Sequence, residues 1–317
     1  MLNNEQIDLD DPNIVLSPLA DPVFGAIYAN AEVAGLAMES LIRATLETDA
    51  ESLIGKVKTV TPQQIHTSTR GRGCRVDIES DTDANERVIT EVQINPDKRI
   101  MIRNLFASSH IFYGASDKGD TVAQMSGKLP RVIHINILGY NIRNNNAELV
   151  QPFKIMYTKK PKEVAIPSFS GYNIQLPRIL AMEPDFTNSL YCWCYTLYTA
   201  HVEGKTVKEV VSMSTALQDY AKQDAGFQQF CERYNFVSAD PKTRKEYVLW
   251  ANDRMREAGE REWAYDEGFD KGTNKGIETV AINMLKRNKP LTEIVEDTGL
   301  SLEKVLTLQK NLSQSPS

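Results

Sequence analysis

The sequence has few cysteines. Only four occur among 317 residues, at Cys74, Cys192, Cys194 and Cys231. Their spacing matches no zinc motif, because a single residue separates Cys192 from Cys194. So few cysteines do not build a disulfide framework in a chain of this length, and we predict free thiols in a reducing compartment.

Segments that would direct the chain to a membrane are also missing. The first residues, MLNNEQIDLDDPNIVL, are acidic and lack the basic and apolar parts of a signal peptide. No run of about 18 apolar residues is present, so no membrane span is predicted. These observations predict an intracellular, cytoplasmic protein without a membrane partner.

An excess of positive charge is absent as well, since the formal net charge is −6. This argues against a surface coated with nucleic acid, but it permits a nuclease, because a bound metal supplies positive charge where a phosphate must lie. The hydrophobic share of 41% and the charged share of 25% are ordinary for globular proteins. We therefore expect a packed core.

Composition divides the chain into four parts. They are an N-terminal arm at 1–18, a mixed α and β domain with a helical extension at 19–235, a charged helical linker at 236–276 and a small helical tail at 277–317. The linker repeats glycine every four residues at Gly268, Gly272 and Gly276. The tail is either a helix-turn-helix that reads DNA or a trihelical unit for packing or oligomerisation.

Hydrophobic periodicity predicts an alternation of helices and strands in the domain. We expect a helix from Pro22 to about Leu46, strands at 54–60, 72–80, 87–94, 131–138 and 153–157, a helix at 97–116, a loop-rich segment at 161–177 and several helices over 178–235. Leu36 and Leu105 are expected in the core. This order is typical of an α+β or α/β protein with a mixed sheet.

The strands at 72–80 and 87–94 form a predicted antiparallel hairpin, since a short polar turn joins them. Alternation in the first strand places Asp77 on one side and both Val76 and Ile78 on the other. In the second strand, Glu91 and Gln93 share a face.

The carboxylates of Asp77 and Glu91 can therefore converge across the hairpin. Two such oxygen ligands suit Mg²⁺ or, alternatively, Mn²⁺. A metal held there would lower the pKa of a bound water and stabilise charge at a phosphate. Gln93 is no base, but its amide could position the water. Alternation alone also places solvated polar side chains on a hairpin, so spacing leaves both interpretations open.

Five segments follow one another in an order that resembles the Rpn family of recombination-promoting nucleases, also described as PD-(D/E)XK-family transposases. They are DPVF from Asp21, RVDIES around Asp77, VITEVQI around Glu91, RIMIRNLFASSHIFYG around Arg103 and LPRVIHINILGY from Leu129. The tail adds two shorter matches, Ala281 to Leu285 and Thr298 to Ser301.

The resemblance implies a PD-(D/E)XK, restriction-endonuclease-like mixed sheet flanked by helices, with a helical C-terminal region. It implies that Asp77 and Glu91 bind the metal and that Gln93 stands where most such nucleases have lysine. Gly25 departs from the family, which commonly has a lysine at that position.

Three further residues are candidates for accessory roles. Arg103 either holds a phosphate or forms an ion pair on a helix surface. Asp21 either belongs to the active site or only caps the first helix. Glu39 either contributes a further carboxylate to the active site from the first helix or lies on the surface.

The function that the resemblance implies is Mg²⁺-dependent deoxyribonuclease activity, with DNA as partner and recombination or transposition as its setting. The alternative is a catalytically inactive scaffold of the same fold that binds DNA or proteins. A second copy of the chain is the other partner that we consider, in a homo-oligomer.

Overall fold

The computed structural model describes residues 13–49, 55–62, 65–66, 74–142 and 148–314. The described residues form two compact units, the first ending at Trp250 and the second beginning at Ala251. None of the helices in these ranges combines the length and the apolar character that crossing a bilayer requires.

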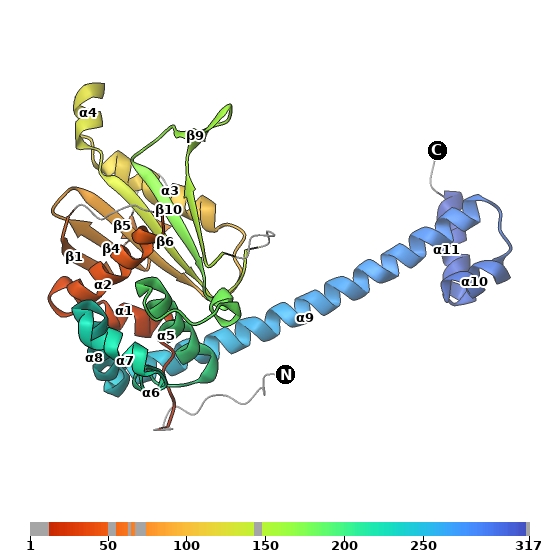
Figure 1. Ribbon diagram of the computed structural model, residues 1–317. Helices are drawn as coiled ribbons and strands as arrows, with labels where there is room; N and C mark the ends of the chain where they lie inside the picture. Colours follow the sequence, from red (N-terminus) through yellow and green to blue (C-terminus); the bar gives the residue numbers. More distant parts are fainter. Residues whose placement is uncertain (1–12, 50–54, 63–64, 67–73, 143–147, 315–317) are drawn as a thin grey trace. The chain divides into compact units, whose positions relative to one another are not determined.

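A six-stranded mixed sheet forms the centre of the first unit (Figure 1). Its strands lie in the order β1 (Val57–Pro62), β4 (Ile78–Thr82), β5 (Glu86–Gln93), β6 (Arg131–Leu138), β10 (Phe169–Gln175) and β7 (Val150–Lys154). β6 is parallel to β5 and to β10, and the other neighbours are antiparallel. Two small sheets pair β2 (Ile65–His66) with β3 (Cys74–Arg75) and β8 (Met156–Tyr157) with β9 (Lys160–Val164).

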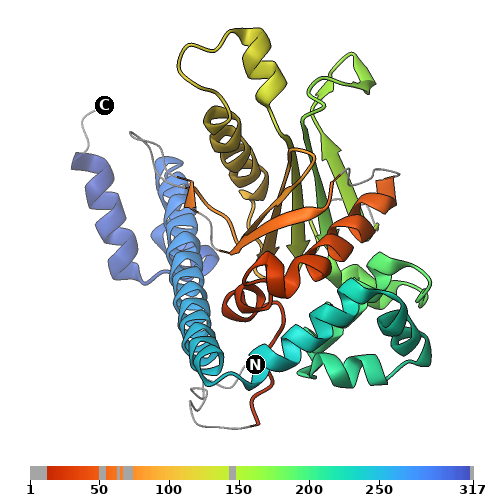
Figure 2. The ribbon, with the colours of Figure 1, turned by 90° about the vertical axis from the view of Figure 1, so that its left-hand side faces the viewer.

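Helices cover both faces of the six-stranded sheet. One face carries α1 (Asp21–Ile27), α2 (Ala31–Leu46), α5 (Ser189–Glu203), α6 (Val207–Ser212), α7 (Thr215–Gln223) and α8 (Ala225–Ala239). The other face carries α3 (Ile100–Gly114), and Figure 2 shows α3 and α2 on opposite sides of the sheet. Short elements complete the unit: α4 (Val122–Lys128), η1 (Glu47–Asp49) and η2 (Leu176–Ala181). The expected mixed sheet flanked by helices is confirmed.

Alternate residues of β5 enter the two cores, as the hairpin pattern predicts. Val88 and Val92 belong to the larger core beneath α2, and the Thr90 hydroxyl lies 3.8 Å from the sulfur of Met38 on that helix. Ile89 belongs to the smaller core beneath α3. Glu91 and Gln93 therefore project toward the side of α3.

Two expectations for the helices are wrong in detail. The first predicted helix is divided, because Asn30 accepts a hydrogen bond from the N–H of Val33 and begins a new helix there. Leu36 and Leu105, expected in the core, are exposed. Only one side of each helix meets the sheet or a neighbouring helix, and these two residues lie on the other.

The segment predicted to be loop-rich contains β9 and the interior strand β10. Its pattern is misleading because β10 buries polar side chains that bond to each other or to the backbone. Asn173 accepts a hydrogen bond from Asn136 at 2.8 Å, and Gln175 accepts one from the N–H of Ile142 at 2.7 Å. A Cβ at Gly171 would overlap with the Phe153 ring, so a larger residue here would require that ring to move.

The glycine repeat does not interrupt helical structure. One helix, α9 (Pro241–Lys286), runs through it and includes the beginning of the segment predicted as the tail. α10 (Leu291–Thr298) and α11 (Leu302–Gln314) follow, and Gly299 ends α10 in the left-handed conformation with φ of +68°. A small core joins these helices through Ala281, Leu285, Ile294, Val305 and Leu308.

The described part of the predicted N-terminal arm is fixed to the first unit. Leu16 is buried, and its carbonyl accepts a hydrogen bond of 2.6 Å from the Tyr234 hydroxyl. The Ser17 hydroxyl lies 2.8 Å from Nδ1 of His201. Residues 1–12 lie outside the described residues.

Candidate active site

The strand predicted over residues 72–80 breaks at Asp77. Val76 belongs to the core beneath α3 and Ile78 to the core beneath α2, although alternation placed both on one side. Oδ2 of Asp77 accepts a hydrogen bond of 2.8 Å from the backbone N–H of Val92, a role that a carbonyl has within a ladder. The carboxylate thus holds the chain where strand pairing ends.

Asp77 and Glu91 are neighbours across this break. The register pairs Ile78 with Thr90. Because the two strands are antiparallel, Asp77, which precedes Ile78, lies opposite Glu91, which follows Thr90. After burial, the charge of Asp77 is the largest influence that raises the pKa of Glu91, while the Asp77 backbone lowers it. Asp77 and Glu91 therefore lie opposite each other across the hairpin.

Both acids are held in an environment that disfavours their charge. Glu91 is 5% exposed, and burial, followed by repulsion from Asp77, raises its pKa to about 8. Burial also raises the pKa of Asp77, and the charge of Asp21 adds to this effect. The pair thus retains a proton at neutral pH unless a positive charge is brought to it.

Arg103 connects Glu91 to Gln93. Its Nη2 lies 3.0 Å from Oε2 of Glu91, and its Nη1 donates to Oε1 of Gln93 at 3.2 Å. One turn further along α3, Ala107 packs into the smaller core and fixes the helix on the sheet. The Gln93 amide donates to the carbonyl of Asn95 at 3.0 Å, which leaves its oxygen directed toward Arg103.

The two remaining candidates lie in different surroundings. Asp21 is the first residue of α1, whose N-cap is Ala20, so the predicted capping role is wrong. Its charge raises the pKa of Asp77. Glu39 instead accepts hydrogen bonds from Arg43 at 2.9 Å and from the Val57 N–H at 3.1 Å. These contacts join α2 to β1 and do not bring Glu39 to the pair.

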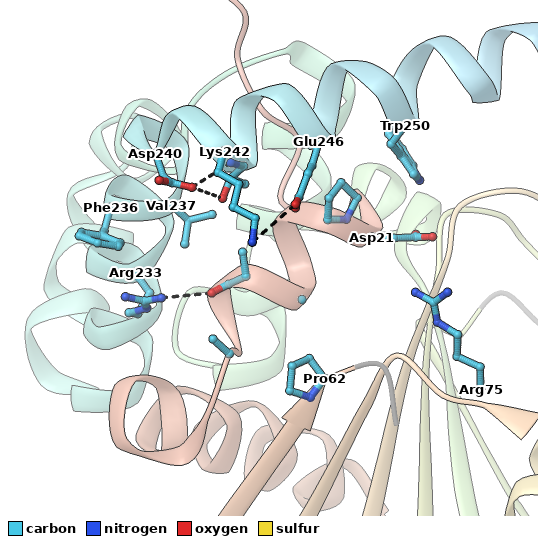
Figure 3. Close-up of a pocket in the computed structure, with 15 residues that line it drawn as sticks. Asp21, Pro62, Arg75, Arg233, Phe236, Val237, Asp240, Lys242, Glu246 and Trp250 are labelled. Carbon is cyan, nitrogen blue, oxygen red and sulfur yellow. Dashed lines mark hydrogen bonds and ion pairs between the residues drawn. The ribbon is translucent and has the colours of Figure 1, made fainter. Parts of the chain in front are cut away.

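Arg75 is a residue whose role sequence reasoning missed. Its side chain is exposed, and its charge lowers the pKa of Asp77. Arg75 and Asp21 both line a cavity of about 850 Å³, where Figure 3 shows them at the same end. The available signal was its position two residues before Asp77 on the polar side of the predicted strand.

The side chains fit a hard divalent cation. Within the described ranges, no three His, Cys, Asp or Glu side chains gather around one point, so a larger acidic cage is not present there. Asp77, Glu91 and the amide oxygen of Gln93 form an all-oxygen set, and Mg²⁺ commonly binds one or two carboxylates while water and substrate phosphate complete its shell. Positive charge between the two acids would also relieve the repulsion that raises the pKa of Glu91.

Three titratable side chains outside the pair are buried. His134 is buried with its Nε2 2.6 Å from the Ser108 hydroxyl, and burial lowers its pKa to about 3. Cys192 and Cys194 are buried free thiols, and burial raises the pKa of Cys192 to about 12. The prediction of free thiols is confirmed for Cys192 and Cys194.

Comparison with protein families gives a match over most of the chain. A family model described as PD-(D/E)XK nuclease family transposase matches residues 18–256. This range contains all six strands of the main sheet and the helix that carries Arg103. No curated protein and no solved structure gives a match.

Proposed function

We propose that this chain, which belongs to the family of PD-(D/E)XK nuclease transposases, is a metal-dependent endonuclease that hydrolyses phosphodiester bonds in DNA. The family supports a nuclease-like activity. The observation that carries the more specific proposal is the buried pair of Asp77 and Glu91, which lie opposite each other at the end of strand pairing, where burial and the charge of Asp77 raise the pKa of Glu91. Recombination or transposition is the process in which we expect it to act.

Asp77 and Glu91 are the proposed ligands of a divalent cation, with Mg²⁺ as the first choice and Mn²⁺ as the alternative. When bound, such an ion supplies Lewis acidity and lowers the pKa of a coordinated water. Glu91 must lose its proton for this role, and its pKa of about 8 makes binding of the ion dependent on pH.

The surrounding residues orient the substrate. The Gln93 oxygen accepts a hydrogen bond from Arg103, so its position is fixed beside Glu91. Arg103 has a planar cation that suits a phosphate oxygen, and its side chain is partly exposed. We therefore propose that Arg103 moves from Glu91 to the scissile phosphate when DNA binds, while Gln93 positions the attacking water. Asp21 tunes the charge of Asp77 from α1.

The test is cleavage of supercoiled plasmid by the purified full chain with Mg²⁺ or Mn²⁺, compared with EDTA. Asp77→Asn should lower the nicking rate by at least about 100-fold, because it removes a metal ligand and keeps the shape of the side chain. The matched control is Asp81→Asn on the same hairpin, where Asp81 pairs with Arg87 at 2.8 Å. Equal nicking by the wild type and Asp77→Asn would refute the proposal.

A catalytically inactive scaffold is the second candidate, and one observation favours it. The guanidinium of Arg103 lies 3.0 Å from Glu91 and lowers its pKa, so the positive charge that the acids require is partly supplied from within the chain. If this function is correct, the chain binds DNA in a salt-dependent manner without cleavage in either metal. The plasmid assay distinguishes the two candidates.

A further inference from the structure

The cavity that contains Asp21 and Arg75 lies close to the carboxylate pair, since Arg75 stands two residues before Asp77 in the chain. Both residues line it, and both change the pKa of Asp77 by their charge. The remaining walls come from α1, the end of α8, the beginning of α9 and the end of β1, all in the first unit (Figure 3). Its volume of about 850 Å³ falls within the range typical of ligand sites.

An aromatic ring lies at the same end of the cavity as these two charges. Figure 3 shows Trp250 beside Asp21 and Arg75. One face of the Trp250 ring stacks on Tyr247, with ring centroids 5.9 Å apart and an angle of 28°. This stacking holds the indole in place, as a platform for a planar ligand requires.

A second platform lies at the opposite end of the cavity. Phe236 is 67% exposed, and the guanidinium carbon of Arg233 is 5.0 Å from the centre of its ring. Arg233 is anchored because its Nη2 donates to the carbonyl of Ala26 at 3.1 Å. An exposed aromatic ring beside a fixed guanidinium offers stacking to one base and positive charge to its phosphate.

The charges along the cavity balance. The cations Arg75, Arg233 and Lys242 are matched by the acids Asp21, Asp240 and Glu246. Surfaces that bind duplex DNA through its backbone are usually strongly basic, whereas single strands bind through aromatic stacking combined with local positive charge. The cavity therefore suits unpaired nucleotides better than a duplex.

We propose that this cavity binds an unpaired stretch of the DNA strand that adjoins the phosphate held at Asp77 and Glu91. Bases stack on Trp250 and Phe236, and a backbone phosphate contacts Arg75. The inference rests on the proposed nuclease function and makes it more specific, because it directs cleavage to junctions between duplex and single-stranded DNA.

The test measures binding alone, in EDTA, so that no cleavage occurs. Fluorescence anisotropy compares a blunt duplex with the same duplex carrying a short thymidine tail at its 3′ or its 5′ end. We expect a tail of one polarity to lower the Kd about tenfold, a size typical of base stacking. Trp250→Ala and Phe236→Ala should each abolish this gain.

The matched control is Trp263→Ala. Trp263 is a 67% exposed tryptophan on α9 that does not line the cavity. This variant should retain the gain in affinity for the tailed duplex. If Trp250→Ala fails to fold, Phe236→Ala and Arg75→Gln, which change exposed side chains, decide the test. Equal affinity for blunt and tailed duplexes, or a gain that survives both Phe236→Ala and Arg75→Gln, would overturn the subsite. Either result is independent of the plasmid assay, so failure here is distinct from failure of the nuclease proposal.

Discussion

β5 buries a glutamate near each of its ends, and the surroundings of the two differ. Glu86, 1% exposed, accepts hydrogen bonds from the Gly55 N–H at 3.0 Å and the Thr82 hydroxyl at 3.1 Å, and it pairs with Arg131 at 3.1 Å. Glu91, 5% exposed, faces the carboxyl of Asp77. Its cation, Arg103, is shared with Gln93.

The difference shows how burial of one residue type serves two purposes. An ionised carboxylate is stable in the interior when donors and a cation surround it, as they surround Glu86. Glu91 has a like charge as its neighbour, which raises free energy and creates affinity for a positive ion. Glu86 therefore stabilises the fold, whereas Glu91 is buried at a cost in stability, and the proposed function gives a reason for that cost.

The comparison predicts different effects on stability when the charge is removed beside Glu86's partner Arg131 and when it is removed beside Glu91. Glu86→Gln should lower the free energy of unfolding by about 2–3 kcal/mol, because Arg131 loses the charge of its buried partner. Asp77→Asn should leave the free energy unchanged or raise it, because it relieves repulsion with Glu91 and retains an oxygen for the Val92 N–H. Urea denaturation in EDTA at neutral pH measures both, and equal losses in the two variants would contradict the distinction.

A smaller effect is predicted for the dependence of stability on pH. The pKa of Glu91 rises from 4.5 to about 8 on folding, so its contribution is complete below 4.5 and is lost as the pH rises through 8. Without metal, the wild type should lose about 1–2 kcal/mol between pH 6.5 and 8. His134 contributes only about 0.4 kcal/mol there and with the opposite sign, since its pKa is lowered from 6.5 and the stability that it costs is lost mainly below pH 6.5.

Urea midpoints in EDTA across this pH interval test the assignment. Glu91→Gln should remove the loss, while Glu86→Gln should retain it despite its lower overall stability. A loss that persists in Glu91→Gln would assign the titration to another group.

The sequence predicted the site at the level of strands and registers. Alternation in 87–94 places Glu91 and Gln93 on one face, and β5 has that arrangement. The same rule failed at Asp77, because its side chain takes a backbone hydrogen bond and breaks the strand. No periodicity encodes such a contact, since it depends on the N–H of Val92 across the hairpin.

Tertiary contacts also decide the features that the sequence did not predict. β10 was missed because Ser170, Asn173 and Gln175 interrupt its apolar pattern, although the fold buries all three. The position of Arg75 on the cavity wall depends on the packing of α1, which places Asp21 at the same cavity. The resemblance to the family identified the acids and Arg103, but the sharing of Arg103 between Glu91 and Gln93 required the structure.

Arg103 provides the most sensitive test of the comparison between Glu86 and Glu91. Glu91 has this cation but not the full set of hydrogen-bond donors that surrounds Glu86. Arg103→Gln should tighten Mn²⁺ binding about fivefold, since a competing charge 3.0 Å from Glu91 is removed. Isothermal titration calorimetry at pH 8 measures this, with Arg87→Gln as a control that removes a cation from Glu79 on the same hairpin. Weaker Mn²⁺ binding in Arg103→Gln would show that Arg103 organises the acids and does not compete for them. The role of Arg103 would then resemble that of Arg131 beside Glu86, and the two ends of β5 would be alike in kind.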